Sequence, residues 1–186
     1  MTYTPGIDRS RVDLLTQLLA DHREVEDLFG EWDRTAPDQR EAYFCALVPV
    51  LVGHEVAEEM VVFPALGGVD EMIRPVIDER LEEQASAEDL LAQMEKMDPA
   101  SGAFATAFDK LRQSVLAHAE AEEQQVFPLL DQQAEVLDRP TLGIRYEKAK
   151  AAAPTHPHPH APSTPPGNLV LGPIAAMADR VRDAVR

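Results

Sequence analysis

One sequence pattern occurs twice in this chain and limits its fold more than any other feature does. Residues 54–66 and residues 118–130 both read His-x-x-x-Glu-Glu-x-x-Val-Phe-Pro-x-Leu. On an α-helix the histidine and the first glutamate of each copy lie one turn apart on the same face. A single copy could be a solvent-exposed helix pair, but two copies with the same Phe-Pro ending favour facing side chains that hold a metal inside a helix bundle. The first candidate ligands are His54, Glu58, His118 and Glu122.

The length and composition of the chain indicate one domain with a tail. A chain of 186 residues with 45% hydrophobic side chains suffices for one core and a surplus segment. Its 33 acidic and 17 basic residues give a formal net charge of -16, which argues against nucleic acid and membrane surfaces as partners and is compatible with cations. The single cysteine, Cys45, excludes a disulfide within the chain, and neither a signal peptide nor a membrane span is recognisable. We therefore expect a soluble cytoplasmic protein.

Apolar residues recur at helical spacing along four stretches of the chain. The expected helices run from Asp8 or Ser10 to about Trp32, from about 38 to about 66, from about 71 to about 97, and from about 104 to about 132. Short turns with glycine, proline or aspartate separate them. Long helices joined by short loops predict an all-α, up-down-up-down four-helix bundle over residues 8–133.

Counting residues along the predicted helices places further polar residues at the same height in the bundle as the histidines of the repeated motifs. His22 lies within the apolar stripe of the first helix, where a lone histidine is more often a hydrogen-bonded core residue than a ligand. In the predicted topology, however, the motif histidines, His22 and the third-helix position Gln84 all lie roughly 18 to 21 Å from the same end of the bundle. Independent core histidines have no reason to share a depth, so we expect His22 to be a ligand. Periodicity does not choose between Glu83 and Gln84 as the inward residue of the third helix.

The helical pattern weakens after the bundle. Residues 134–172 are predicted to be a partly extended linker with room for a short helix, because their second half is rich in proline and histidine. The run from His156 to His160 could bind a transition metal weakly, but extended His-Pro repeats point their histidines in different directions, which favours a simple linker. Residues 173–186 are predicted to form an amphipathic helix that docks on the bundle or on a second subunit, giving a homo-oligomer in the latter case. Its apolar face is made of Ile174, Met177, Val181 and Val185.

The ordered set of His22, the His54 motif and the His118 motif, with both motifs closing in Phe-Pro, resembles the hemerythrin-like HHE cation-binding domains. The resemblance covers about residues 11–132, and the tail after Ala153 is similar to that of actinobacterial hemerythrin-like proteins. It implies a four-helix bundle around an oxo-bridged non-haem di-iron centre, with two iron ions as the cofactor. The ligands that it implies are His22, His54, Glu58, His118 and Glu122, with Glu55 as a further ligand in some members.

The third helix departs from the pattern of these domains. They usually have Glu-His there, and this chain has Glu83-Gln84. Because a neutral amide oxygen is a weak iron ligand, the resemblance implies a site that is one ligand short, recruits Glu83 or holds water in the gap.

Three functions are compatible with these residues. The first is a di-iron protein that binds or senses dioxygen, peroxide or a related small oxidant, since carboxylates and imidazoles suit iron. The second is a di-iron enzyme that disproportionates peroxide or oxidises ferrous iron, which an exchangeable coordination position at Gln84 would favour. The third is a structural or interaction bundle in which metal is incidental. We favour the first, narrowly over the second.

Overall fold

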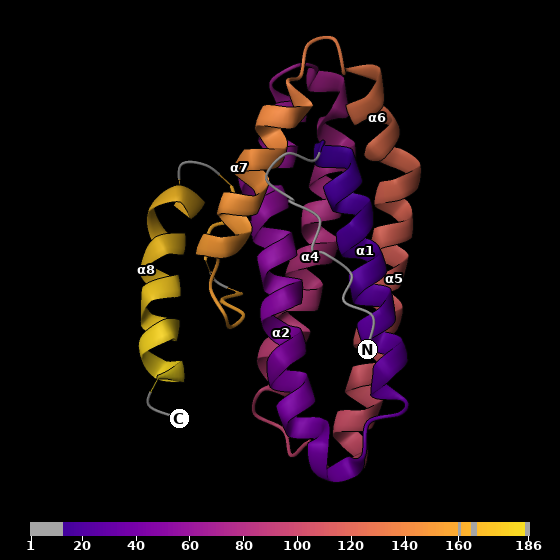
Figure 1. Cartoon of the computed structure of the whole chain (residues 1–186), viewed down its shortest axis with the longest axis vertical. Helices are drawn as coiled ribbons and strands as arrows, with labels where there is room; N and C mark the ends of the chain where they lie inside the picture. Colours follow the sequence, from indigo (N-terminus) through magenta and orange to yellow (C-terminus); the bar gives the residue numbers. More distant parts are fainter. Residues whose placement is uncertain (1–12, 160, 165–166, 185–186) are drawn as a thin grey trace, which may run out of the picture.

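The computed structural model describes residues 13–159, 161–164 and 167–184, and these residues form helices and connecting segments without any strand. Four antiparallel columns make the bundle, so the predicted all-α bundle is confirmed (Figure 1). The first column is α1 (Leu14–Trp32); the second is η2 (Pro37–Gln39), α2 (Arg40–Ala57), η3 (Glu58–Val62) and α3 (Phe63–Gly67); the third is η4 (Glu71–Ile73) and α4 (Arg74–Met94); the fourth is α5 (Gly102–Gln125) and α6 (Phe127–Gln132). The start expected for the first helix, at Asp8 or Ser10, lies outside the described residues. Within the described part of the chain, no helix has both the length and the apolar character needed to cross a membrane.

The core of the bundle consists of two apolar clusters. One lies at the end where α1 turns into α2, and there the ring of Trp32 stacks on Phe108 with 3.9 Å between ring centroids. The other lies towards the opposite end and includes Leu14, Leu18 and Val62, which are fully buried. Burial of each such side chain stabilises the fold by about 1.5–3 kcal/mol. The buried histidines and glutamates belong to neither cluster.

Both copies of the repeated motif interrupt their helical columns at the Phe-Pro step. Pro64 and Pro128 have no N–H group to donate to the carbonyl four residues earlier, which breaks the regular ladder of hydrogen bonds. In the first copy the chain widens into the π-helical turn η3, which the Phe63 N–H closes by donating to the Glu58 carbonyl. In the second copy the column breaks between α5 and α6. Such wide turns are frequent at functional sites, and here the turn begins at a candidate ligand, Glu58.

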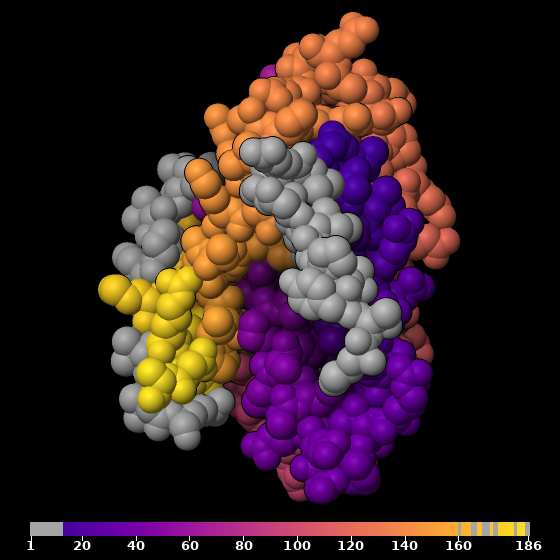
Figure 2. Space-filling model, viewed as in Figure 1, coloured from indigo at the N-terminus to yellow at the C-terminus, as the bar shows by residue number. Residues whose placement is uncertain are grey.

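The short helix allowed for after the bundle is α7 (Arg139–Ala152), and it packs against α1 and α2. Asp138 caps its first turn by accepting a hydrogen bond from the Thr141 N–H at 3.1 Å. At Gly53 on α2, the Lys150 carbonyl oxygen of α7 lies 3.8 Å from the position that a Cβ would take, which is an ordinary van der Waals distance and shows how closely the two helices approach. Figure 2 shows α7 and the segment after it lying over the bundle, with α8 at the outer edge.

The last helix, α8 (Gly167–Asp183), begins before the predicted start at residue 173 and contains Pro173. Of the four residues of its expected apolar face, only Met177 has a side chain that the structure describes, and its predicted packing is wrong. Met177 is 64% exposed, whereas Ala176 and Asp179 are buried. Asp179 turns inward because its carboxylate accepts hydrogen bonds from the backbone N–H groups of Thr155 and His156, and such a tertiary contact leaves no trace in the spacing of apolar residues. The side chains of Ile174, Val181 and Val185 lie outside the described set, and docking on a second subunit stays a prediction.

Candidate metal centre

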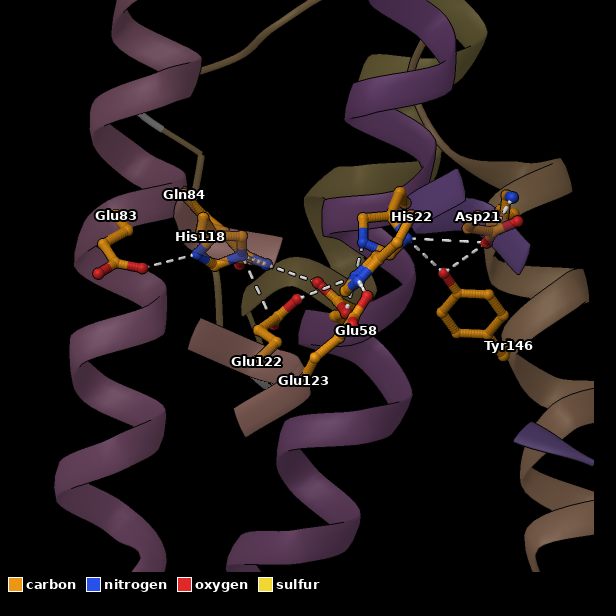
Figure 3. A network of polar contacts seen from close by, with 11 residues as sticks. Asp21, His22, Glu58, Glu83, Gln84, His118, Glu122, Glu123 and Tyr146 are labelled. Carbon is orange, nitrogen blue, oxygen red and sulfur yellow. Dashed lines mark hydrogen bonds and ion pairs between the residues drawn. The ribbon is translucent and has the colours of Figure 1, made fainter. Parts of the chain in front are cut away.

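Side chains from three columns of the bundle converge on one point between the helices. His22 comes from α1, His54 from α2, Glu58 from η3 and Glu122 from α5, and one ligand atom from each lies within 4.8 Å of all the others. All four residues are buried. His118 lies at the edge of this group with its Nε2 atom 3.5 Å from the Glu122 carboxylate (Figure 3). The structure thus places close together the five residues His22, His54, Glu58, His118 and Glu122 that the repeated motif and the depth argument predicted as ligands.

The inner atoms of these residues face one another without forming hydrogen bonds. The Nε2 atom of His22 lies 3.3 Å from Glu122, and that of His54 lies 3.5 Å from Glu58. The His22 Nε2 atom, the Glu58 Oε1 atom and both carboxylate oxygens of Glu122 are buried and have no hydrogen-bond partner. Buried polar atoms are normally satisfied. A convergent set of unsatisfied nitrogen and oxygen atoms is what a bound transition-metal ion satisfies, so these residues fit a metal.

The outer nitrogen of each histidine is held by a separate partner. The Nδ1 atom of His22 lies 3.0 Å from a Glu123 oxygen, that of His54 lies 2.7 Å from the Tyr146 hydroxyl, and that of His118 lies 2.8 Å from a Glu83 oxygen. These contacts place the proton on Nδ1 and leave the Nε2 lone pair for the centre. Metal-binding histidines in proteins are usually oriented in this way.

The partners of His54 form a chain that reaches across to α7. The Tyr146 hydroxyl donates to the Asp21 carboxylate at 2.8 Å (Figure 3). The same hydroxyl accepts from His54, and the Lys150 ammonium group donates to the Asp21 carboxylate at 2.7 Å. Burial by itself raises the pKa of Asp21, but the bonds from His54 and Lys150 outweigh it and hold the pKa below its usual value. Burial and the nearby Asp21 raise the pKa of Tyr146 well above its usual value, so the hydroxyl keeps its proton.

The sequence analysis named Glu83 but missed the other outer partners. Their positions in the sequence could have pointed to Glu123 and Asp21, because Glu123 is the second glutamate of the repeated motif and Asp21 directly precedes His22. No sequence pattern could have pointed to Tyr146 and Lys150, because they lie far along the chain from His54 and come close to it only when α7 packs on the bundle.

The two central carboxylates have opposite protonation tendencies. Burial, with the charges of Glu122 and Glu55, raises the pKa of Glu58 well above its usual value. Burial also acts to raise the pKa of Glu122, but its contacts with His22 and His118 lower it below the usual value. In the bare protein these surroundings favour the charged form of Glu122 and the protonated form of Glu58, and a bound cation favours the ionised form of both.

The third column settles which residue of the Glu83-Gln84 pair points inward. Gln84 is buried, and its Nε2 atom donates to Glu58 Oε2 at 2.8 Å and lies 3.5 Å from His118 Nε2. Glu83 lies on the outer side of His118, where its second oxygen accepts from the buried Arg80 at 2.9 Å. Gln84 is thus the inward residue, and Glu83 contacts the centre only through His118.

Two other groups of predicted residues lie apart from the centre. Glu55 is buried but lines a separate cavity with Glu59 and Glu88. In the His-Pro run, His156 contacts Glu95 and Asp183, and His158 contacts Asp179. Among the residues that the structure describes, the metal-compatible group contains neither of these histidines, and His160 lies outside the described residues.

A helix bundle that buries histidine and glutamate around one point, with their inner atoms unsatisfied, defines a metal-binding helical protein. Residues 13–130 match the model of the hemerythrin HHE cation binding domain, and the chain belongs to this family. It is 31% identical over 134 residues to an uncharacterised hemerythrin-like protein of Schizosaccharomyces pombe. That match covers 72% of this chain and 66% of the relative, so the chain spans just under two thirds of the length of that protein. No solved structure matches the chain.

Proposed function

We propose that the centre holds two iron ions and binds dioxygen or a related small oxidant such as peroxide. The observation that carries this proposal is the donor set, which combines three imidazoles with two carboxylates in one buried layer. Mixed imidazole and carboxylate ligands suit iron, and inward-facing histidines and glutamates hold di-iron centres in other helix bundles. The cytoplasmic location expected from the sequence stays a prediction.

Each residue has a distinct part in this proposal. His22, His54 and His118 offer Nε2 lone pairs, while Glu58 and Glu122 offer carboxylate oxygens. Both oxygens of Glu122 lack partners, which suits a carboxylate that binds two ions. Paired iron ions, when bound, supply the electrons that dioxygen or peroxide takes up.

The surrounding residues hold protons and exclude water. Glu123, Tyr146 and Glu83 keep the protons of the three histidines on Nδ1. The ring of Phe127 stacks on His22 with 5.1 Å between ring centroids and covers the layer with an apolar surface.

Gln84 favours a second function, a di-iron enzyme that disproportionates peroxide or oxidises ferrous iron. The amide of Gln84 lies at the centre where the pattern of the family has an imidazole, and a weak ligand leaves a coordination position exchangeable. Peroxide turnover by the iron-loaded protein separates this function from simple binding, since a carrier or sensor returns its ligand unchanged.

Elemental analysis of protein purified from iron-replete cells tests the di-iron proposal. We expect about two irons per chain, because two carboxylates and three imidazoles can serve two ions. His54→Ala and His118→Ala should each lose most of the iron, and the matched control His156→Ala, outside the centre, should keep it. One zinc per chain, or no metal, would contradict the proposal. An absorption spectrum that changes when oxygen or peroxide is added would support the choice of ligand.

A further inference from the structure

A cavity adjoins the metal centre where the tail, the described part of the chain after α7, covers the bundle. One wall is formed by residues of α2, η3 and α4, and the other by the tail, which contributes Pro154, Asn168 and Ala175. The cavity holds about 50 Å³ of free space. A water molecule needs roughly 10–15 Å³ of such space, so the cavity admits only small molecules.

Gln84 joins this cavity to the centre. Its side chain lines the cavity, and its Nε2 atom donates to Glu58 at 2.8 Å and lies 3.5 Å from His118 Nε2. Among the described residues that line the cavity there is none of the five candidate ligands. The amide of Gln84 is therefore the part of the cavity wall that reaches the centre, and it lies where a weak ligand leaves a position exchangeable.

Two buried amides offer hydrogen-bond acceptors at the cavity. The Nδ2 atom of Asn168 donates to the Ser163 carbonyl at 3.1 Å and approaches the Glu59 carbonyl at 3.5 Å. Because both neighbours are acceptors, the amide orientation is fixed and its Oδ1 atom is left without a partner. The Oε1 atom of Gln84 also has no partner. Both side chains line the cavity, so a small molecule with O–H groups finds two acceptors there.

The carboxyl groups at the cavity do not make it a site for ions. Burial, together with the nearby Glu88, raises the pKa of Glu59 to about 8, and burial raises the pKa of Glu55 well above its usual value. Glu88 accepts a hydrogen bond from the backbone N–H of His158 at 2.7 Å. A neutral polar molecule suits such surroundings better than an ion does.

A second hollow also approaches the centre, but it ends on the outer side of a ligand. It lies between α1 and α5 and is lined by His22, Ala119 and Glu123 among others. Glu123 contacts the Nδ1 atom of His22 at 3.0 Å, so this hollow meets the nitrogen that faces away from the centre. The imidazole ring itself then stands between the hollow and the centre, which favours the cavity at Gln84 as the way in.

We propose that this cavity is the chamber through which hydrogen peroxide, or dioxygen of similar size, reaches the centre at Gln84, and that the tail excludes larger oxidants. The proposal rests on the proposed function and deepens it, since it names the side from which the oxidant arrives and the size that is accepted. Hydrogen peroxide fits best, because its O–H groups can donate to the unpartnered oxygens of Asn168 and Gln84. The tail thereby gains a function that the repeated motif does not imply.

Stopped-flow absorption of the iron-loaded, full-length protein tests the route. Val56→Phe fills the cavity from α2 and should slow the reaction with hydrogen peroxide by about tenfold or more, at unchanged iron content. Asn168→Leu keeps the size of the side chain but removes an acceptor, and should slow the same reaction by about fivefold. Circular dichroism checks that each variant is folded.

The matched control is Ala119→Phe, which fills the hollow beside His22 and should leave the rate unchanged. A slower reaction in Ala119→Phe, with no change in Val56→Phe, would overturn the proposal and place the entry at His22.

A variant that loosens the tail tests its part in selecting by size. The carboxylate of Asp179 accepts from the backbone N–H groups of Thr155 and His156, so Asp179→Ala weakens the docking of α8. The reaction with tert-butyl hydroperoxide, relative to hydrogen peroxide, should then become faster by about tenfold. Met177→Ala, on the exposed side of α8, should keep the original preference. The same preference in Asp179→Ala as in the unaltered protein would show that the tail does not select.

A measurement that does not depend on iron separates this proposal from the proposed function. In the full-length protein loaded with diamagnetic zinc, dissolved dioxygen under pressure shifts the NMR signals of the methyl groups that it contacts. The signals of Val52 and Val56 at the cavity should shift more than those of Leu47, which is fully buried in an apolar cluster. Equal shifts at Val52 and Leu47 would overturn the chamber. An iron-loaded protein that reacts with neither oxidant would contradict the proposed function alone, because the methyl shifts report entry whatever the metal does.

Discussion

At the scale of single residues, each candidate ligand is oriented by a partner outside the centre. His54 shows this most fully, because its Nδ1 atom is held by Tyr146, and Tyr146 is held by Asp21. Loss of an outer partner does not remove a ligand, but it frees the ring to rotate and to change the nitrogen that carries the proton. The outer partners are therefore expected to affect metal affinity and stability together.

Tyr146→Phe is expected to destabilise the metal-free protein and to speed iron release. Removal of the hydroxyl takes the nearest acceptor from the His54 Nδ1 atom, leaving only the Asp21 carboxylate at 3.7 Å, and takes one donor from the buried Asp21. We expect a loss of about 1–3 kcal/mol in the free energy of unfolding. Urea denaturation and the rate of iron transfer to a chelator measure the two effects.

Tyr43→Phe is the matched control for this change. The Tyr43 hydroxyl donates to the Leu28 carbonyl at 2.7 Å, far from the centre, so its loss should leave iron release unchanged. If the two variants release iron at the same rate, Tyr146 has no part in holding His54.

Gln84→His is expected to hold iron more tightly, because it replaces a weak amide with an imidazole at the inward position of α4. Iron should leave for a chelator more slowly, and any peroxide turnover should fall as the exchangeable position is filled. Gln84→Ala should change iron retention little. Faster iron release from Gln84→His would show that the position does not accept a ligand.

Glu83→Ala is expected to weaken iron binding without removing a direct ligand. Glu83 accepts from the Nδ1 atom of His118, and loss of such an outer partner typically lowers metal affinity by about 10- to 100-fold. Glu82→Ala, on the exposed side of α4, is the control. Complete loss of iron from Glu83→Ala would instead identify Glu83 as a direct ligand.

At the scale of elements, the tail is attached to the bundle by contacts between histidines and carboxylates. His156 lies between Glu95 at the end of α4 and Asp183 on α8, with Arg182 and Glu41 around the same hollow. Burial lowers the pKa of His156, but its contacts with Glu95 and Asp183 raise it, and the pKa lies above its usual value of 6.5.

Docking of α8 is therefore expected to weaken as the pH rises. A histidine whose pKa is raised by folding stabilises the docked state fully below 6.5, and this contribution is lost as the pH passes through the raised value. Hydrogen exchange of the α8 amides should be faster at about pH 8 than at about pH 6, after correction for the intrinsic rate. His156→Gln should remove this difference, and a pH dependence that survives the substitution would contradict the assignment to His156.

Removal of all residues after Ala153 should leave the iron content unchanged. The truncated chain keeps α7, and with it Tyr146 and Lys150, while none of the described residues of the lost segment belongs to the metal-compatible group. A chain that ends before Arg139 also loses α7 and should retain iron less well. Elemental analysis of both chains checks this, and a fall by half or more in the longer one would show that the tail supports the centre.

At the scale of the whole molecule, the bundle places a polar layer between two apolar clusters in a strongly acidic protein. Glu58 and Glu122 are 1% and 0% exposed, and burial of carboxylates without a cation is unfavourable. The apolar clusters supply the stability that allows this layer to persist, and a bound metal removes the electrostatic penalty.

Removal of the metal should therefore lower the melting temperature. A ligand present at 100 times its dissociation constant stabilises the folded state by about 2.7 kcal/mol, which corresponds to roughly 5–10 °C for a chain of this size. Calorimetry with and without a chelator measures the shift. His54→Ala, if it lacks metal, should melt at the same temperature in both conditions, and equal melting temperatures for the unaltered protein would show that metal binding and folding are not coupled.

The sequence by itself determined the helical columns and the two His-Glu pairs. Both depend on local geometry, since residues four apart on a helix share a face wherever the helix lies. His22 also followed from the sequence, because depth along antiparallel helices can be counted in residues. The tertiary structure decided the rest. Packing of α4 on its neighbours fixed its rotation and so placed Gln84 inward and Glu83 outward, which two equally good periodic registers could not do. Tyr146 reached His54 only because α7, distant in the chain, docks on the bundle, and contacts between such helices depend on the packed shape of both surfaces.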